Sequence, residues 1–375
     1  SHLTELDRVK MVAQLEKLIA LNNVTTGYAA LGRYAAEFPS LSAFFADFNF
    51  EHNLPGLSSN IRSALRRPSR ELKRKINQDL TWLDKTDRHL ISLFEPEYPA
   101  LLKQTYDPPL CLFAQGNIAL LNKPQIAIVG SRRATAVGQK IATEFAAKLS
   151  EVGLVITSGM AAGIDAAGHQ GALSRGTIAV LGTGCDRVYP LRNERLMIRI
   201  KENGLLISEY PLGREARPYQ FPQRNRIVTG MSLGTIIVEA AEKSGTLISA
   251  RLAMEQGREV FAIPGSIYGN QNKGCHRLIQ QGAKLVQSIE DILEELPFIG
   301  IDVSTSNLRT LPRLDNVELD RAETSILAHL SSLPMSVDEL FEVTSIPLTE
   351  IITLMLSLEM KGFVDLEPAG YVRSR

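Results

Sequence analysis

The sequence predicts an α/β protein built on an extended Rossmann-like parallel sheet, with a small all-helical domain before the sheet and a winged-helix domain after it. Three observations lead to this prediction. Apolar runs alternate with helical stretches through the middle of the chain, which is typical of a parallel sheet covered on both faces. Only helical periodicity is found before this region, and a helix–helix–helix–two-strand pattern follows it. The 375 residues also favour two or three domains over one.

We therefore expect four segments. They are an N-terminal helical domain over residues 1–95, a Rossmann-like domain over 96–296, a linker over 297–317 and a winged-helix domain over 318–375.

The N-terminal domain is predicted from apolar residues at helical spacing, such as Leu15, Leu18 and Ile19. The stretch LPGLSSNIRSAL (54–65) resembles the turn of a SAM-like or helix-hairpin-helix-like module, whose backbone N–H groups can hold a phosphate. Serine replaces the second glycine that is usual in this turn, so plain helix packing and DNA contact both stay open.

The sheet domain is predicted from apolar runs of strand length with helical stretches between them. The expected strands are 126–130, 154–159, 177–182, 205–210, 235–240, 259–265 and 283–286, and the expected helices are 138–149, 164–173, 194–201 and 244–256. Ligands of such sheets lie at the carboxyl ends of the strands, near the point where the strand order reverses.

The winged helix is predicted from helices at 321–330, 336–344 and 348–363 and a two-stranded wing at 363–373. Its third helix carries Glu350, Glu359 and only Lys361. Such a helix cannot supply the phosphate contacts that dominate DNA affinity. We therefore expect protein interaction or autoregulation here rather than duplex binding.

The charges are unevenly distributed, although the formal net charge is zero. Residues 111–289 hold 21 Lys and Arg against 12 Asp and Glu, a net of +9, whereas 318–375 hold 4 against 10, a net of −6. The segment RSALRRPSRELKRK (62–75) has seven bases and one acid. This asymmetry predicts a polyanionic partner for the middle of the chain.

Loops of small residues follow several expected strands and can cradle an anion. They are GSRRATAVG (130–138), SGMAAGIDAAGH (158–169), GTGCDRVYP (182–190) and SGT (244–246). Backbone N–H groups and helix N-termini in such loops bind phosphates, and Arg132 and Arg133 would add charge-assisted contacts. The stretch FPQRNRIVTGMS (221–232) adds two arginines around an asparagine, just before the apolar run GTIIVE.

Enzyme and metal signatures are weak. Asp165 and His169 are four residues apart on one expected helix, but with no third ligand nearby a helix cap and a packed histidine are the better interpretation. The chain has no phosphate-binding G-x-x-x-x-G-K-[ST] motif, and Arg187 replaces the third glycine of a dinucleotide fingerprint. The three widely spaced cysteines are typical of a reducing cytoplasm. We expect no cofactor, no metal and no catalytic residue.

In the order of its motifs, the chain resembles the DNA-processing protein A (DprA/Smf) family from about residue 97 to 286. The motifs are YPALL, DPPLCLFAQG, AIVGSRRATAVG, SGMAAGIDAAGH, TIAVLGTGCDRVYP, LISEYPLG, FPQRNRIVTGMS, EAAEKSGTLISARLA, GREVFAIPG and GCHRLIQQGAKLV. The resemblance implies a cytoplasmic homodimer that binds single-stranded DNA in natural transformation, protects it and helps to load the RecA recombinase.

The resemblance also assigns site residues. We expect DNA binding by Gly130, Ser131, Arg132, Ser158, Gly159, Arg192, Phe221, Arg224, Asn225, Arg226, Lys243, Ser244, Gly245 and Thr246. The bases would lie against Phe221, Tyr189 and Tyr219. The segment 276–285 would form the dimer interface through His276, Leu278, Ile279 and Leu285, although these apolar residues could equally be ordinary core.

Two other functions have sequence signatures that this chain matches only in part. Nucleotide phosphoribohydrolases on the same kind of sheet carry P-G-G-x-G-T-x-x-E. Here Gly234, Thr235 and Glu239 are kept, but the proline and one glycine are missing and the glutamate is one place late. A winged-helix transcription factor is disfavoured by the acidic third helix.

Overall fold

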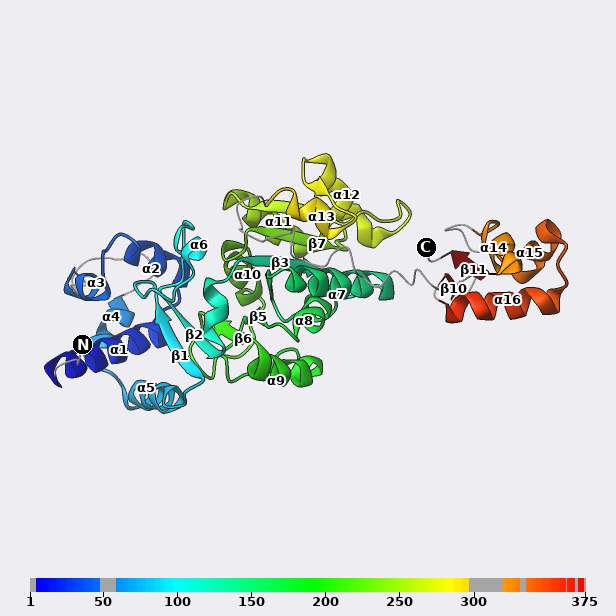
Figure 1. The fold of residues 1–375 in the computed structure, drawn as a ribbon. Helices are drawn as coiled ribbons and strands as arrows, with labels where there is room; N and C mark the ends of the chain where they lie inside the picture. The colour runs from blue at the N-terminus through cyan, green and yellow to red at the C-terminus, as the bar shows by residue number, and fades with distance from the viewer. Residues whose placement is uncertain are drawn as a thin grey trace. The chain divides into compact units, whose positions relative to one another are not determined.

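The computed structural model describes residues 5–47, 59–296, 320–330, 335–361, 363–367 and 370–373 (Figure 1). The chain divides into two compact units, Ser1–Asp302 and Val303–Arg375. The expected linker, 297–317, and the turn of the hairpin-like stretch, 54–58, lie outside the described residues.

The first unit begins with a helical region. Its helices are α1 (Glu5–Val24), α2 (Tyr28–Ala35), α3 (Leu41–Asp47), α4 (Ser59–Arg66) and α5 (Arg70–Leu83). Leu18, Leu21 and Leu31 are buried in the same core that runs beneath the sheet. Ser69 caps α5, because its hydroxyl accepts a hydrogen bond from the backbone N–H of Leu72. The helical region thus packs on the sheet.

The sheet has nine strands among the described residues, in the order β1-β2-β6-β5-β4-β3-β7-β8-β9. They are β1 (Arg88–Ser92), β2 (Cys111–Gly116), β3 (Gln125–Gly130), β4 (Val155–Ser158), β5 (Thr177–Val180), β6 (Leu205–Ser208), β7 (Gly234–Val238), β8 (Glu259–Ala262) and β9 (Lys284–Leu285). Along this order, each neighbouring pair in the series β6-β5-β4-β3-β7-β8-β9 is parallel, as predicted. The strands β1 and β2 are antiparallel additions at one edge.

These two edge strands depart from the expected layout. β1 lies inside the range that the sequence assigned to the N-terminal helical domain, so the sheet begins before residue 96. β2 lies within the expected sheet domain, at a position for which no strand is predicted. Neither follows a helical crossover, which is the pattern that predicted the other strands.

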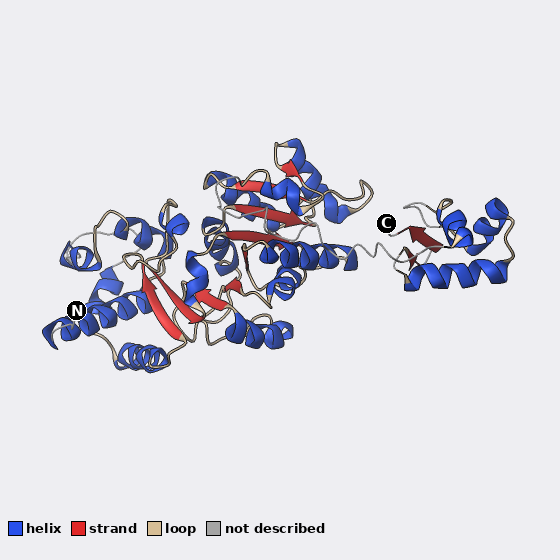
Figure 2. Cartoon of the chain, in the orientation of Figure 1, coloured by secondary structure: helices blue, strands red, loops and turns tan. Residues whose placement is uncertain are grey.

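Helices cover both faces of the sheet (Figure 2). They are α6 (Ala100–Lys103), α7 (Ala136–Glu151), α8 (Ile164–Ala172), α9 (Glu194–Asn203), α10 (Gln220–Gly230), α11 (Thr246–Glu255), α12 (Lys273–Gln280) and α13 (Ile289–Leu293), with short 3₁₀ turns at Ile118–Asn122, Leu191–Asn193 and Asn270–Asn272.

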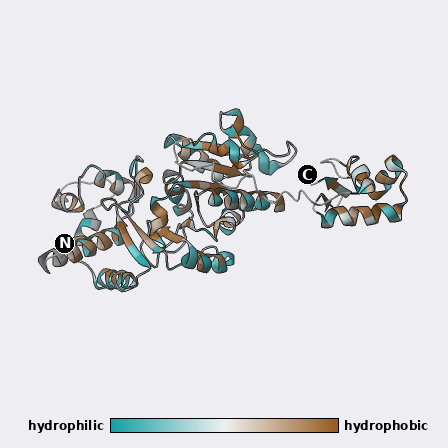
Figure 3. Ribbon diagram, viewed as in Figure 1, coloured by the Kyte–Doolittle hydropathy of each residue, from teal (hydrophilic) through white to brown (hydrophobic). Residues whose placement is uncertain are grey.

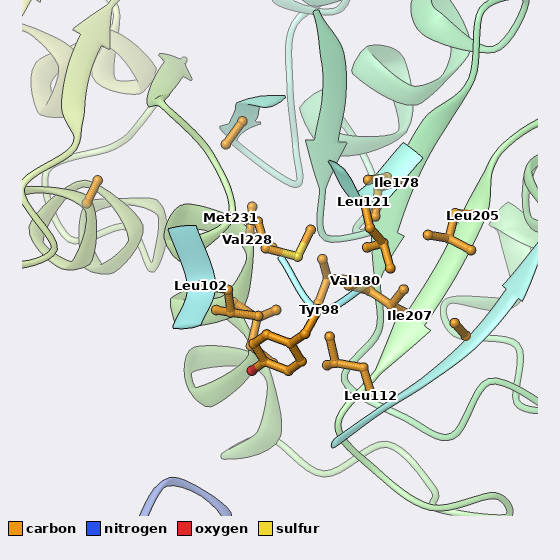
Figure 4. Close-up of a cluster of buried hydrophobic side chains, with 14 of the residues drawn as sticks. Tyr98, Leu102, Leu112, Leu121, Ile178, Val180, Leu205, Ile207, Val228 and Met231 are labelled. Carbon is orange, nitrogen blue, oxygen red and sulfur yellow. The ribbon is translucent and has the colours of Figure 1, made fainter. Parts of the chain in front are cut away.

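Alternate strand residues enter different cores, as the two-residue period of a strand requires. Ile126 and Ile128 pack with residues of α7 and α8, whereas Ala127 and Val129 belong to the core that includes residues of α10, α11 and α12. Figure 3 shows hydrophobic residues along these strands. Figure 4 shows part of the core that contains Ala127 and Val129. In it, Tyr98 and Leu102 lie close to Val228 and Met231 of the α10 region.

The second unit is a winged helix. It contains α14 (Arg321–Leu327), α15 (Val337–Thr344), α16 (Leu348–Met360), β10 (Val364–Glu367) and β11 (Gly370–Arg373), and the two strands pair antiparallel. Capping boxes at Asp320 and Ser336 fix the starts of α14 and α15. No single helix in the described ranges is long and apolar enough to span a membrane, although one bent pair, α15 with most of α16, passes the test of length and composition together.

Candidate nucleic-acid interface

The candidate site is a cavity at the carboxyl edge of the parallel sheet, where the strand order reverses. The chain leaves β3 on one side, through α7 to β4, whereas β7 pairs with the other side of β3. The cavity has a volume of about 460 Å³ and is lined by the loops after β3, β4 and β7 and by the first turns of α10 and α11. This is the position at which open α/β sheets bind their ligands.

Most of the predicted DNA-binding residues come together here. Those that line the cavity are Gly130, Ser131, Arg132, Phe221, Arg224, Asn225, Ser244, Gly245 and Thr246. A smaller neighbouring cavity of about 80 Å³ shares Arg132, Phe221 and Arg224, and adds Gly159 and Arg192. These predicted residues come from five separate segments of the chain that are adjacent only in the fold.

Arg224 forms the floor between the two cavities. The residue is 3% exposed, and its guanidinium donates through Nη1 to the carbonyl oxygens of Gly159 and Val180. Its Nε donates to Oδ1 of Asn225 at 3.1 Å. These contacts fix the orientation of a cation that lines both cavities.

Two glycines make this arrangement possible. A Cβ on Gly159 would come within 2.6 Å of the Arg224 guanidinium. Gly163 has a φ of +79°, and a Cβ there would meet the carbonyl oxygen of Ser131 at 2.2 Å. The small residues of the loop 158–169 are thus required by close approach and by backbone conformation.

Burial shifts the ionisation of the charged pair below the cavity. Burial lowers the pKa of Arg224 to about 10, and the nearby Asp165 carboxylate offsets part of that effect. Burial raises the pKa of Asp165, against the influence of Arg224 and of the N–H groups of Gly159 and Ala161. Arg224 therefore stays protonated at neutral pH and supplies a fixed positive charge.

Asp165 acts on the loop rather than as a helix cap. It lies in the first turn of α8, whose N-cap residue is Gly163. Its Oδ2 accepts hydrogen bonds from the backbone N–H of Gly159 at 3.0 Å and of Ala161 at 3.4 Å. The sequence predicts a helix cap at Asp165, whereas in the fold its carboxylate fixes the loop that contains Gly159 and Ala161.

Phe221 provides an aromatic surface between cations. The guanidinium carbon of Arg132 lies 5.6 Å from its ring centroid and that of Arg224 lies 5.9 Å away. The ring of Tyr189 is tilted by 32° to Phe221, with the centroids 5.1 Å apart. Tyr189 is 44% exposed. An aromatic face beside two arginines is the combination that binds unstacked bases together with their phosphates.

The loop after β3 is braced by Glu239, a residue that the sequence linked only to the rival enzyme. Its carboxylate accepts hydrogen bonds from the backbone N–H of Thr135 at 2.9 Å and from the Thr135 hydroxyl. Thr135 in turn caps α7 by accepting from the N–H of Gly138. Glu239 has a φ of 55° and marks the end of β7. The carboxylate therefore positions the loop after β3.

Three predicted residues lie outside both cavities. Arg226 is 6% exposed and forms ion pairs with Glu209, at 2.6 Å from Nη2, and with Asp107, at 3.3 Å from Nε. Ser158 is fully buried, and its hydroxyl donates to the carbonyl of Ile128 at 2.6 Å. Lys243 is exposed but lines neither cavity. The spacing of Arg224 and Arg226 on α10 explains the difference, since residues two apart face different directions on a helix.

Arg226 thus corrects the expectation that both arginines of FPQRNRIVTGMS face an anion. Its charge is already neutralised inside the fold, where it joins α10 to the segments at Glu209 and Asp107. Ser158 is corrected in the same way, because its only hydroxyl proton is used within the sheet.

The segment predicted for dimerisation divides between core and surface. Leu278 is 4% exposed and belongs to the core of the protomer, and Ile279 packs against that core. Leu285 is 42% exposed on β9, the last strand of the sheet. Nε2 of His276 lies 3.0 Å from the carbonyl oxygen of Gly265.

His169 is a packed core histidine. It is fully buried, and its Nδ1 lies 2.8 Å from the hydroxyl of Thr177, which itself donates to the carbonyl of Ile156. Burial lowers the pKa of His169 to about 3, so the ring is neutral. Within the described ranges, no three His, Cys, Asp or Glu side chains gather in a way that could hold a metal ion.

Comparison with protein families identifies the fold's relatives. The model of the DNA recombination-mediator protein A family matches residues 89–297, and the model of the DprA winged-helix domain matches 312–370. The chain belongs to the DNA recombination-mediator protein A family. The family match begins at residue 89, within β1, and so includes the edge strands.

Individual relatives agree with this assignment. Protein Smf of Escherichia coli is 40% identical over 308 residues, which cover 81% of this chain and 82% of that protein. DNA processing protein DprA of Streptococcus pneumoniae is 48% identical over 209 residues, covering 55% of this chain and 74% of that protein.

Two solved structures are also similar. DNA processing protein A of Streptococcus pneumoniae has a TM-score of 0.58 at 37% identity, covering 79% of this chain and 99% of that one. DNA processing protein A of Helicobacter pylori, whose structure concerns its single-stranded DNA binding mode, has a TM-score of 0.50 at 33% identity, covering 53% and 92%.

Proposed function

We propose that this chain binds single-stranded DNA in the cavity at the carboxyl edge of the sheet. The observation that carries the proposal is the placement of Phe221 between Arg132 and the buried Arg224. Phosphates would take the guanidinium groups and the N–H groups of the loops at 130–133 and 244–246, while a base lies on Phe221. The Helicobacter pylori relative, whose structure concerns single-stranded DNA binding, supports this choice of ligand.

The choice of a single strand over a duplex follows from the aromatic face. A duplex hides the faces of its bases in the stack, so it would present phosphates alone to Phe221 and Tyr189. A single strand offers both groups at once. Stacking of one base on an aromatic side chain contributes about 1–3 kcal/mol, which gives the preference for single strands.

A salt titration with a matched pair of variants tests this proposal. We would measure fluorescence anisotropy of a labelled oligothymidine with the full chain, with Arg132→Gln and with Arg175→Gln. Arg132 lines the cavity, and Arg175 is an exposed arginine that precedes β5 at the opposite edge of the sheet. Wild-type affinity should fall steeply with salt, with a log–log slope of about −0.7 for each phosphate contacted.

Arg132→Gln should weaken binding about tenfold and flatten the slope by about 0.7, whereas Arg175→Gln should change neither. Equal effects of the two variants, or a salt-independent affinity, would refute the site.

We further propose that the protein protects incoming single strands in natural transformation and helps to load a RecA-type recombinase. The family's description as a recombination mediator supports a role next to a recombinase. The measurement is recombinase ATP hydrolysis on DNA already coated with single-strand-binding protein. This chain should shorten the lag before hydrolysis, and Arg132→Gln should not. An unchanged lag with the wild-type chain would contradict the loading role.

We also propose a homodimer that forms through the segment 276–285. Leu285 is exposed on an edge strand, and such an edge can pair with a second copy. Leu278 would support the segment from inside the protomer rather than contact the second copy, because its side chain is buried in the protomer core. Two linked sites on one strand would raise the apparent affinity by avidity.

Leu285→Arg tests the dimer, since a symmetric interface would bury the new charge twice. Light scattering should give a folded monomer with weaker DNA binding, and circular dichroism checks the fold. A folded dimer of undiminished stability would contradict the interface, and an unfolded chain would favour the core interpretation.

A further inference from the structure

A second cluster of donors lies on α5, far along the chain from the loops that form the cavity. The segment 62–75 carries seven bases and one acid. The acid, Glu71, pairs with Lys75 at 3.4 Å. Arg70, Lys73 and Arg74 are exposed, and no ion pair is recorded for them among the described residues. Their charges are therefore available to a ligand.

These three cations share a groove with the polar residues that follow them. The groove is shallow and open to solvent, and its described lining is Arg70, Lys73, Arg74, Asn77, Gln78 and Thr81. The positions are i, i+3, i+4, i+7, i+8 and i+11, which is one face of a helix. None of these six residues is acidic. The Thr81 hydroxyl already donates to the carbonyl of Asn77, so five side chains remain as donors.

The opposite face of α5 holds the groove residues in place. Leu72, Asp79 and Trp82 are buried. The Asn23 amide of α1 donates to Oδ2 of Asp79 at 2.8 Å, and the ring of Trp82 packs edge-on against Phe113 of β2, with centroids 6.1 Å apart. The helix is therefore held against the sheet, and its donors face outward on a rigid element.

The spacing and chemistry of the groove residues favour a chain of phosphates over a single anion. One helical turn rises about 5.4 Å, so donors recur along the groove at a distance comparable to that between successive phosphates in an extended strand. Guanidinium and ammonium groups bind phosphate oxygens, and amides can add hydrogen bonds. Among the described residues that line the groove, none is an aromatic residue on which a base could stack.

We propose that the α5 groove is a second nucleic-acid site that binds the phosphodiester backbone without reading the bases. The inference rests on the proposed function, because the same single strand that occupies the cavity would continue to this groove. The cavity then selects single strands by stacking, and the groove adds sequence-independent affinity to strands long enough to reach both.

The test compares two triple variants of the full chain on short and long oligothymidines. Arg70→Gln, Lys73→Gln and Arg74→Gln together remove three charges from the groove. Lys123→Gln, Lys148→Gln and Arg175→Gln remove three exposed charges elsewhere on the first unit. Anisotropy would be measured with strands of about 6 and about 40 nucleotides, each as a salt series, and circular dichroism would check that all chains are folded.

The groove variant should bind the short strand within about twofold of wild type and the long strand about tenfold more weakly. Its salt slope on the long strand should be smaller by about two, since three phosphates at about 0.7 each would be released. The control variant should change neither strand by more than about twofold.

A second variant, Asn77→Asp with Gln78→Glu, places negative charge in the groove without touching the cations, and should weaken only the long strand. A 40-base-pair duplex shows whether the groove contacts phosphates alone. If the groove variant binds the duplex more weakly as well as the long single strand, the contact is to phosphates alone.

Equal loss in the groove and control variants would reduce the effect to net charge and overturn the proposal, as would unchanged binding of the long strand. Failure of the proposed function gives a different result, because the wild-type chain would then fail to bind the short strand, or Arg132→Gln would bind it normally.

Discussion

The two units of this chain each contain a buried charge beside a helix that could meet DNA, but they use that charge in opposite ways. In the first unit, the buried Arg224 lies under an open cavity, and the exposed Arg132 stands next to it. In the winged helix, the buried Glu323 accepts hydrogen bonds from Nζ of Lys361 at 2.6 Å and from the hydroxyl of Ser357 at 2.6 Å. The one basic residue of the third-helix region is therefore consumed inside the unit.

The outward faces differ accordingly. The exposed surface of α16 presents Leu348, Ile352 and Leu356, with exposures of 41%, 52% and 56%, beside the exposed Glu350 and Glu359. Such a face suits a protein partner better than phosphates. The comparison teaches that the winged-helix fold alone does not predict DNA binding, because function depends on the groups that the fold presents.

The largest effect is expected at Arg224. Arg224→Ala removes the fixed cation and leaves the buried Asp165 without its charged partner. We expect single-strand affinity to fall by more than 100-fold, or about 2.7 kcal/mol, since truncating a buried, hydrogen-bonded charge at a binding site costs about 2–5 kcal/mol of affinity. Anisotropy with oligothymidine measures the loss, and circular dichroism checks the fold.

Arg224→Lys is the control for that variant, because it keeps the charge but not the planar fork that reaches both Gly159 and Val180. It should recover part of the affinity. If Arg224→Ala binds as well as wild type, the buried cation has no part in binding.

The next effect is expected at Phe221. Phe221→Ala should weaken single-strand binding by about 2 kcal/mol, or some 30-fold, because one stacked base is lost. Phe221→Trp should retain binding. Since stacking is not ionic, the salt slope should stay at its wild-type value. A changed slope together with unchanged affinity at low salt would show that the ring only positions Arg132.

The sequence predicted the parallel strands and the loops that line the cavity, because both depend on local patterns. Apolar runs predict buried strands, and Gly-rich turns after them predict ligand loops. What it could not predict was the partner of each charge. Arg224 and Arg226 are equivalent in the motif, yet Glu209 and Asp107 neutralise one of them. Those acids are distant in sequence, so only the fold reveals the pairing.

The edge strands and the bracing carboxylate were missed for related reasons. β1 is a five-residue strand with three half-buried positions, and it pairs antiparallel without a helical crossover. Glu239 looked like an imperfect catalytic residue, because its role depends on Thr135, 104 positions away. Long-range hydrogen bonds of this kind leave no periodic signal in the sequence.

The first unit should become less stable as the pH rises from about 4 to about 7. Burial raises the pKa of Asp79 from 3.8 to about 7. The folded state therefore holds its proton more tightly than the unfolded state, so the stability that this group contributes is present below about pH 4 and is lost as the pH rises to 7.

Asp79→Asn should accordingly raise the free energy of unfolding of the first unit more at pH 8 than at pH 5, by up to about 2 kcal/mol. Its melting temperature should rise in the same sense. Calorimetry of the full chain measures this. Asp84→Asn, at an exposed carboxylate just past the same helix, should show no such pH dependence. An identical shift at both pH values would contradict the buried ionisation.

The winged helix should respond to pH with the opposite sign. The hydrogen bonds from Lys361 and Ser357 lower the pKa of Glu323 from 4.5 to about 2. This carboxylate contributes stability that is present above about pH 4.5 and is lost as the pH falls toward 2. Glu323→Gln should therefore destabilise the second unit at pH 7, by on the order of 1–2 kcal/mol.

Hydrogen exchange of residues 320–373, followed by mass spectrometry, reports on this unit separately. Glu342→Gln, at an exposed acid of α15, is the control and should leave the exchange unchanged. Faster exchange in both variants would mean that net charge, rather than the Lys361 pair, stabilises the unit.

The smallest effect is expected from removing the winged helix altogether. Residues 318–375 hold ten acidic and four basic residues, and the exposed face of α16 is apolar and acidic. Deleting them should change single-strand affinity by less than about tenfold, which is about 1.4 kcal/mol. At low salt the deletion should slightly tighten binding, because like charge is removed. At about 0.15 M salt the Debye length is about 8 Å, and this difference should vanish.

Glu350→Gln with Glu359→Gln in the full chain is the matched control and should reproduce the low-salt gain in part. A loss of more than tenfold on deletion, at either salt concentration, would show that the winged helix contacts DNA despite its charge, and the contrast between the two units would then fail.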